Sequence, residues 1–328
     1  MRRLLDRVFP DKFILWMIAD VIAASLRPAR GMAATLVDYA TLAAIFSLFL
    51  LHGVRLPREA LVAGLVDWRL HVAILASTFA VFPLAGIALA AAFPGLLSPA
   101  LWTGILFLCA LPSTVQSSIA FTSMAGGNVA GAVAAAAASN LIGVFLTPAL
   151  VSLMLSAQEA ELAWGGIWKV VGLLFLPFVL GHALRPWLFP LIANRPGLTL
   201  TVDKGTILLA VYGAFSAAMV EGLWRRIAPE EIALVTAACL LLLGIILAAT
   251  MLIGRLGGFS RESRAAILFC GSVKSLASGI PMARILFPGA AAGVVILPVM
   301  LFHSFQLIVC AWIAARLAAQ NSPSAVKA

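Results

Sequence analysis

Charged side chains are scarce in this chain of 328 residues. Asp, Glu, Lys and Arg together make up 11% of the sequence, whereas a soluble domain carries about 25%. Hydrophobic residues make up 63%, and no water-soluble core of this length could bury so many of them. The sequence therefore predicts an all-α, polytopic membrane protein embedded in a lipid bilayer.

Motifs for metal, nucleotide and nucleophilic chemistry are also missing. The chain contains no HExxH, GxxxxGK[ST] or CxxC motif, and its four histidines lie on separate segments. Its four cysteines lie within apolar runs and are expected to be small core residues. These absences argue against an enzyme and against a resident metal or cofactor. The net charge of +9 suggests basic cytoplasmic loops rather than a nucleic-acid partner.

Apolar runs separated by Pro, Gly or charged residues predict ten membrane spans. The expected spans are 13–27, 36–53, 70–93, 99–125, 128–155, 164–185, 204–224, 230–254, 264–287 and 291–316.

The distribution of basic residues predicts the orientation. If the N-terminus lies in the cytoplasm, the loops on the opposite side carry only Arg27, Arg30, Arg225 and Arg226, and most other Lys and Arg residues lie inside. An even number of spans then puts both termini in the cytoplasm. We expect an integral protein of the plasma (inner) membrane, and the sequence indicates no oligomeric state.

The fourth and ninth expected spans share a short pattern. The fourth contains "STVQS" (113–117) and the ninth contains "GSVKS" (271–275), and Met-Ala follows each at the same spacing. Because a repeat of five spans is odd, its two copies enter the membrane from opposite sides, as in many secondary transporters. The chain is therefore expected to contain two inverted five-helix repeats, 1–155 and 164–318, and a cytoplasmic tail, 319–328.

Helix breakers accompany both copies of the pattern. Pro112 precedes the first, and Gly271, Gly279 and Pro281 flank the second. We expect residues 112–118 and 271–279 to be unwound and to approach each other near the membrane midplane. The alternative is a Ser/Thr-rich contact between two continuous helices.

Lys274 stands in the middle of the ninth span, where a lysine costs about 2.5–3.5 kcal/mol to insert. Its ammonium is expected among the polar groups of both breaks, such as Ser113, Thr114, Gln116 and backbone carbonyls. It could act as a fixed cation, or it could release its proton in one state of a cycle, because burial disfavours charge. An inert structural tether is the remaining interpretation.

Three motifs resemble a known family. They are "LPSTVQSSIAFTSMAGGNVAGA" (111–132), "FCGSVKSLASGIPMA" (269–283) and "LPVMLFHSFQLIVCA" (297–311). On these motifs the whole chain resembles the bile acid:sodium symporter superfamily, and more closely an SBF-like branch that lacks most sodium ligands. The resemblance implies a panel domain of spans 1, 2, 6 and 7 and a core domain of the other six, with spans 4 and 9 broken and crossed.

The departures from that family concern its sodium ligands. The resemblance implies that a Glu, a Gln and an Asn of the ninth span are replaced here by Phe269, Val273 and Lys274. It also aligns two hydroxyl ligands with Ala132 and Ala136, a Ser-Asn pair with Ser117 and Ser118, and a Gln with Thr78. Sodium binding is therefore expected to be absent or weak, and the Lys274 ammonium could occupy the place of one sodium ion.

The candidate substrate or ion site comprises polar side chains of the broken spans and of their expected neighbours. These residues are Lys274, Ser113, Thr114, Gln116, Ser117, Ser118, Ser272, Ser275, Thr78, Asn140, His303 and Gln306. His303 and Gln306 share a helix face, either as a hydrogen-bonding pair of the core or as a proton relay or substrate contact. Asp20 lies in the middle of the first span and could line the crevice between panel and core, pair with a cation, or lie near water because this span is short.

Two functions fit these features. One is secondary-active transport of a small organic solute, in particular an anion, by alternating access and with possible proton coupling. The other is a membrane regulator or receptor that keeps the transporter fold without transport, because fold alone does not separate the two.

Overall fold

The computed structural model describes residues 12–55, 67–155, 168–222, 228–287 and 289–321. These residues form helices and connections, and no strand occurs among them. The helices are α2 (Lys12–Leu26), α3 (Met32–Arg55), α5 (Trp68–Ala76), the π-helix η1 (Ser77–Val81), α6 (Phe82–Ala92), α7 (Pro99–Ala110), α8 (Gln116–Met124), α9 (Val129–Met154), the π-helix η2 (Val171–Phe175), α11 (Leu176–Ala183), α12 (Arg185–Ala193), α13 (Pro196–Val220), α14 (Pro229–Leu256), α15 (Arg261–Ser272), α16 (Leu276–Leu286) and α17 (Ala291–Asn321).

Many of these helices can cross a membrane. Seven stretches of the described residues are long and apolar enough, and the pair Trp168–Ala183 and Arg185–Ala193, bent by 87°, would make an eighth. The polytopic helical class is therefore confirmed. The number of ten spans stays a prediction, because α2, α7 and α8 are each shorter than a full span. The expected tail and the junction between the repeats lie largely outside the described residues.

The segment between the sixth and seventh expected spans differs from the prediction. It was expected to be a loop up to residue 204, but it forms α12, and α13 already begins at Pro196. A proline at the start of a helix has no hydrogen bond to lose, so Pro186 and Pro196 initiate these helices rather than interrupt them. No residue of α12 is buried, and Trp187 is 69% exposed, as expected for a helix in the membrane interface.

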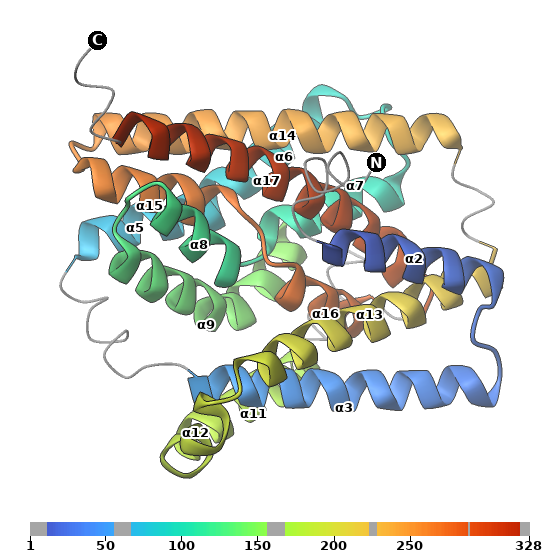
Figure 1. Ribbon diagram of the computed structural model, residues 1–328. Helices are drawn as coiled ribbons and strands as arrows, with labels where there is room; N and C mark the ends of the chain where they lie inside the picture. The colour runs from blue at the N-terminus through green and yellow to red at the C-terminus, as the bar shows by residue number, and fades with distance from the viewer. Residues whose placement is uncertain (1–11, 56–66, 156–167, 223–227, 288, 322–328) are drawn as a thin grey trace.

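The helices form two groups (Figure 1). In one group, α3 packs against α11 and α13, and α13 also packs against α2. These helices come from the spans that the resemblance assigns to the panel. The other group contains α5 to α9, α14, α15 and α17, and α13 meets this group through α16 and α17.

The backbones of α3 and α11 approach each other very closely. A Cβ atom added at Gly53 would lie 1.9 Å from the carbonyl oxygen of Phe178. One added at Gly181 would lie 2.0 Å from the carbonyl oxygen of Leu50. Both distances are far below van der Waals contact, so this crossing requires glycine at both positions.

Candidate functional site

Two helix breaks meet in the core. Residues 111–115 separate α7 from α8, and residues 273–275 separate α15 from α16. The Ser275 amide donates a hydrogen bond of 2.9 Å to the carbonyl of Pro112, which joins the two breaks directly. The expectation of two contacting breaks is confirmed, but both are shorter than the expected ranges 112–118 and 271–279.

The Lys274 ammonium lies inside this crossing. Lys274 is 1% exposed. Its Nζ donates hydrogen bonds to the carbonyl oxygens of Thr78 at 2.8 Å, Cys109 at 2.8 Å and Leu111 at 2.6 Å. An ammonium has three donors, so these three carbonyls satisfy it completely. We refer to these three carbonyls as the ammonium seat.

The first carbonyl of the ammonium seat is free because of a proline. In η1 the Phe82 amide bonds to the carbonyl of Ser77, so the bonding pattern is shifted by one residue. In the same pattern, the carbonyl of Thr78 would accept from the amide of residue 83, but residue 83 is a proline and has no N–H. The Thr78 carbonyl is therefore left for the ammonium.

The other two carbonyls are free because α7 ends. A continued helix would direct the Ser113 amide to the carbonyl of Cys109, but this amide donates instead to the Ser139 hydroxyl at 3.0 Å. Leu111 lies beyond the helix end in extended backbone. The C-terminal end of a helix also carries a partial negative charge, which favours a cation there.

An aromatic ring completes the surroundings of the ammonium. The Lys274 Nζ lies 4.0 Å from the centroid of the Phe82 ring, within range of a cation–π interaction. The expected contacts with hydroxyl and amide side chains are wrong, because the Nζ hydrogen bonds go to backbone carbonyls alone. The expectation of backbone carbonyls is confirmed: Cys109 and Leu111 lie at the end of α7, beside the first break, and Thr78 lies in η1.

Gln306 holds the backbone of Lys274 from α17. Its Oε1 accepts from the Lys274 amide at 2.7 Å, and its Nε2 donates to the Lys274 carbonyl at 2.9 Å. The same Nε2 lies 2.8 Å from Nδ1 of His303. Because an amide nitrogen can only donate, His303 accepts at Nδ1 and, when neutral, carries its proton on Nε2.

Replacement of Gln306 by leucine is expected to lower stability by about 2–4 kcal/mol. Leucine fills a similar volume but leaves a buried amide and a buried carbonyl unpaired, at about 1–3 kcal/mol each. The measurement is the melting temperature of the purified protein in detergent. The matched control is Gln320→Leu on the exposed surface of the same helix. Equal melting temperatures of the two variants would contradict the role of Gln306.

The polar groups near the breaks also bond to α15 and α9. The Ser113 hydroxyl donates to the carbonyl of Cys270 at 2.6 Å. Asn140 donates to the carbonyl of Ser113 at 2.8 Å and accepts from the Ser278 hydroxyl at 2.7 Å. Asn140 therefore links α9 to both broken segments.

Three other predicted residues bond within their own segments. The hydroxyls of Ser118, Ser272 and Thr78 donate to the carbonyls of Thr114, Leu268 and Ile74, four residues earlier in each case. All three residues are buried. Their hydroxyls are therefore used inside the core.

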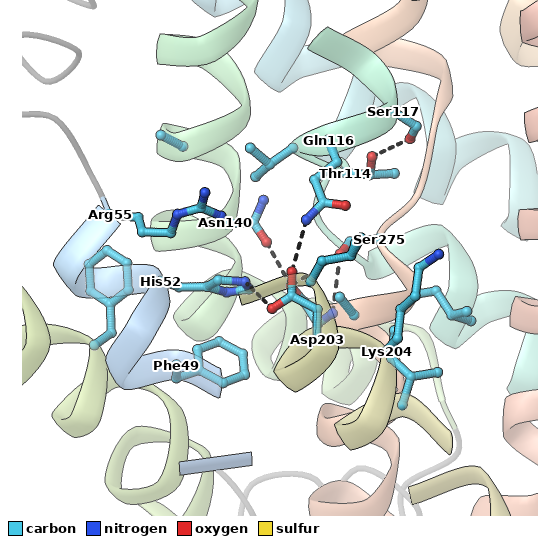
Figure 2. Close-up of a pocket in the computed structure, with 18 of the residues that line it drawn as sticks. Phe49, His52, Arg55, Thr114, Gln116, Ser117, Asn140, Asp203, Lys204 and Ser275 are labelled. Carbon is cyan, nitrogen blue, oxygen red and sulfur yellow. Dashed lines mark hydrogen bonds and ion pairs between the residues drawn. The ribbon is translucent and has the colours of Figure 1, made fainter. Parts of the chain in front are cut away.

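A cavity of about 520 Å³ lies beside the crossing, between the two helix groups (Figure 2). Six predicted residues line it: Thr114, Gln116, Ser117, Asn140, Ser275 and His303. The other six do not line it: Lys274, Ser113, Ser118, Ser272, Thr78 and Gln306. The predicted set therefore divides into residues that face the cavity and residues that support its floor.

Sequence reasoning missed four ionisable residues of this cavity, which are His52, Arg55, Asp203 and Lys204. Figure 2 shows the Asp203 carboxylate between Gln116 and His52. Gln116 Nε2 donates to Oδ2 at 2.8 Å, and His52 Nε2 lies 3.3 Å from Oδ1. Proline is common in the first turn of a helix, so Pro196 could have been taken as a helix start. Asp203 would then have been expected about two turns inside a helix instead of in a loop.

A second cavity of about 520 Å³ lies at the opposite ends of α3 and α13. Its lining includes Asp38 and Arg284, which form an ion pair that joins α3 to α16. Within the described part of the chain, no group of three His, Cys, Asp or Glu side chains could hold a metal ion.

The chain is similar to several known proteins over nearly its whole length. It is 47% identical to protein PA2026 of Pseudomonas aeruginosa over 97% of this chain and 96% of the relative. It is 44% identical to YfeH of Escherichia coli strain K12, by its name a proposed symporter, over 97% and 98%. It is 26% identical to sodium/bile acid cotransporter 7 of Mus musculus over 93% and 92%.

A family model extends this similarity. The model of the SBF-like CPA transporter family matches residues 11–319, which include both helix breaks, Lys274 and the cavity between the helix groups. The match agrees with the resemblance of the motifs around residues 111–132 and 269–283. This integral membrane protein therefore belongs to the SBF-like CPA transporter family.

Proposed function

We propose that the protein is a secondary-active transporter of a small amphipathic organic anion. The observation that carries the proposal is the cavity beside the crossed breaks. Its walls are mainly apolar, its floor presents Thr114, Asn140 and Ser275, and its lining includes Arg55 and Lys204. Such a site suits a solute with an apolar body and one negative group.

Alternating access is the mechanism that these features favour. The two cavities lie at opposite ends of α3 and α13, and the helix breaks lie in the core between the helix groups. Ten spans in two inverted repeats would account for a pair of broken helices that cross. With both termini in the cytoplasm, as the basic residues indicate, the cavity that contains Arg55 and Lys204 faces the cytoplasm.

Lys274 is proposed to act as a fixed cation in place of a sodium ion. Three carbonyls surround its ammonium as they would surround a metal cation, and Lys274 is 1% exposed and does not line the cavity. The enclosure favours this role over that of a mobile proton carrier. The positions that the resemblance assigns to sodium ligands include Phe269, Val273 and Ala132, whose side chains cannot coordinate it.

Sodium is therefore expected to have no specific effect on the protein. The melting temperature in detergent should be the same in sodium chloride, potassium chloride and choline chloride at equal ionic strength. A ligand that binds the folded state would raise it by mass action. Stabilisation by sodium over potassium that disappears in Ser117→Ala or Thr78→Val would contradict this expectation.

The transport proposal is tested with purified protein in proteoliposomes. Uptake of labelled cholate and of a panel of smaller carboxylates is measured with and without sodium; cholate is included because one relative is named a sodium/bile acid cotransporter. Saturable uptake that exceeds the uptake by empty liposomes is the expected result. If none of the anions is taken up although the protein is folded, the alternative of a non-transporting regulator is favoured.

A further inference from the structure

We propose that the Asp203–His52 pair is a proton-binding site, and that its proton controls the contact between α13 and α8. This inference rests on the proposed transport function for its role, but the site itself is argued from contacts. Asp203 lies on α13 and is 5% exposed, where the two helix groups face each other. A carboxylate removed from water requires compensating partners.

The partners of this carboxylate are few. Gln116 gives it one hydrogen bond at 2.8 Å, through Oδ2. Oδ1 receives no hydrogen bond from the described residues, although His52 Nε2 lies 3.3 Å away. Among the described residues, no Lys or Arg lies within ion-pair distance of Asp203, so the basic side chain nearest to Oδ1 is the imidazole of His52.

A carboxylate and an imidazole in contact are groups between which a proton can be bound and released. Histidine changes its charge between about pH 5 and 8, unlike Lys or Arg. The protonated pair carries a cation beside Oδ1, and the pair that has lost its proton leaves this buried oxygen without a full partner. A proton from the cavity water is therefore the ligand that this arrangement lacks.

Other charged groups surround the pair. The same cavity is lined by Arg55 of α3, Lys204 of α13 and His303 of α17. The helices that pack against α13 also carry Asp20, Asp38, Arg185, Arg284 and Arg316, and none of these residues lines the cavity. His182 of α11, which packs against α3, lies with Nδ1 3.4 Å from the carbonyl oxygen of Gly53 and does not line the cavity either. Lys274 lies behind the floor with its three donors bound, so it is not available for proton exchange with the cavity.

The proton affects a contact between the two helix groups. Gln116 is the first residue of α8, directly after the helix break, and Asp203 belongs to the opposite group. A hydrogen bond to a charged carboxylate is about twice as strong as one to a neutral acceptor. Protonation of Asp203, or transfer of the His52 proton to it, would weaken this contact and release α8 from α13.

Coupling to the solute follows from charge. An organic anion that enters the cavity brings a negative group close to Asp203. A proton on the pair offsets this charge, so anion and proton favour each other's binding, and this effect is reciprocal. The proposed transporter would then carry the anion together with a proton rather than with sodium.

The first experiment needs no solute. Infrared difference spectra of the purified protein between about pH 8 and pH 5 are recorded for the wild type, His52→Gln, Asp203→Asn and the matched control His182→Gln. The expected result is that the bands removed by His52→Gln also shift in Asp203→Asn and stay unchanged in His182→Gln. If the His52 bands change at the same pH in Asp203→Asn as in the wild type, the proposal of a proton site is wrong.

The second experiment measures coupling in proteoliposomes with cholate as the probe. An inward proton gradient should stimulate uptake severalfold in the wild type and should have no effect in Asp203→Asn, whose fold is verified by its melting temperature. Gradient-driven uptake in Asp203→Asn would overturn the coupling and leave the transport proposal standing. No cholate uptake together with a positive infrared result would overturn the transport of cholate and leave the proton site standing.

Discussion

Replacement of Lys274 by alanine is expected to lower stability by on the order of 5 kcal/mol and to abolish transport. The variant leaves the three carbonyls of the ammonium seat without a donor, and each unsatisfied buried group costs about 1–3 kcal/mol. It also leaves an empty volume beside the Phe82 ring. The measurements are the melting temperature in detergent and the yield of monodisperse protein, followed by anion uptake.

Two further variants of Lys274 separate charge from volume. Lys274→Met keeps much of the side-chain volume and removes the charge, so it should be nearly as harmful as alanine. Lys274→Arg keeps the charge, but a planar guanidinium does not fit three carbonyls that surround a compact ammonium, so rescue should be partial. Lys169→Met, at an exposed position, is the matched control. If Lys274→Ala melts and transports like the wild type, Lys274 is a bystander.

Replacement of Gly181 by alanine is expected to be the second most harmful change. The new methyl group would lie 2.0 Å from the carbonyl oxygen of Leu50, so α3 and α11 would have to move apart. Overpacking of this kind costs about 1–3 kcal/mol, and more when backbone atoms are involved. Gly53→Ala, which meets the carbonyl oxygen of Phe178 at 1.9 Å, should behave alike. The melting temperature in detergent is the readout.

The control variant for this prediction is expected to leave the melting temperature equal or to raise it. Gly244 lies on α14, and nothing lies within 4 Å of a Cβ added there. Because glycine in a helix is less favourable than alanine by roughly 0.5–1 kcal/mol, Gly244→Ala should leave the melting temperature equal or raise it. A similar loss in Gly244→Ala and Gly181→Ala would show that the close approach of α3 and α11 is not the cause.

The fold class could be predicted from composition because hydropathy records burial in lipid directly. The positions of the breaks could also be predicted, since Pro112 removes a helix hydrogen bond. The lengths of the breaks could not be predicted, because a glycine in this fold can permit close packing inside a helix as well as unwind it. Gly279 remains helical, and a Cβ added there would lie 2.5 Å from Leu111, so this glycine permits packing instead of unwinding.

The candidate site could be predicted only in part. Lys274 was recognisable from the cost of a charge within an apolar span, but its partners were not, because they are backbone carbonyls whose availability depends on helix register. Asp203 was missed since the start of α13 was expected eight residues too late, and His52, although placed within the second span, had no recognisable partner without it. The Asp203 carboxylate was thus assigned to a solvated loop, where a charged side chain needs no buried partner.

Pro83 and Pro112 have a consequence for how this chain can vary. Because the ammonium seat is made of main-chain oxygens, Thr78, Cys109 and Leu111 can be exchanged for other residues of similar size without loss of a single acceptor. Comparison of side-chain identities at these positions would therefore not reveal that they supply the acceptors. Relatives with the same built-in cation are therefore expected to keep Lys274 together with Pro83, which leaves the Thr78 carbonyl free, and Pro112, which follows the end of α7.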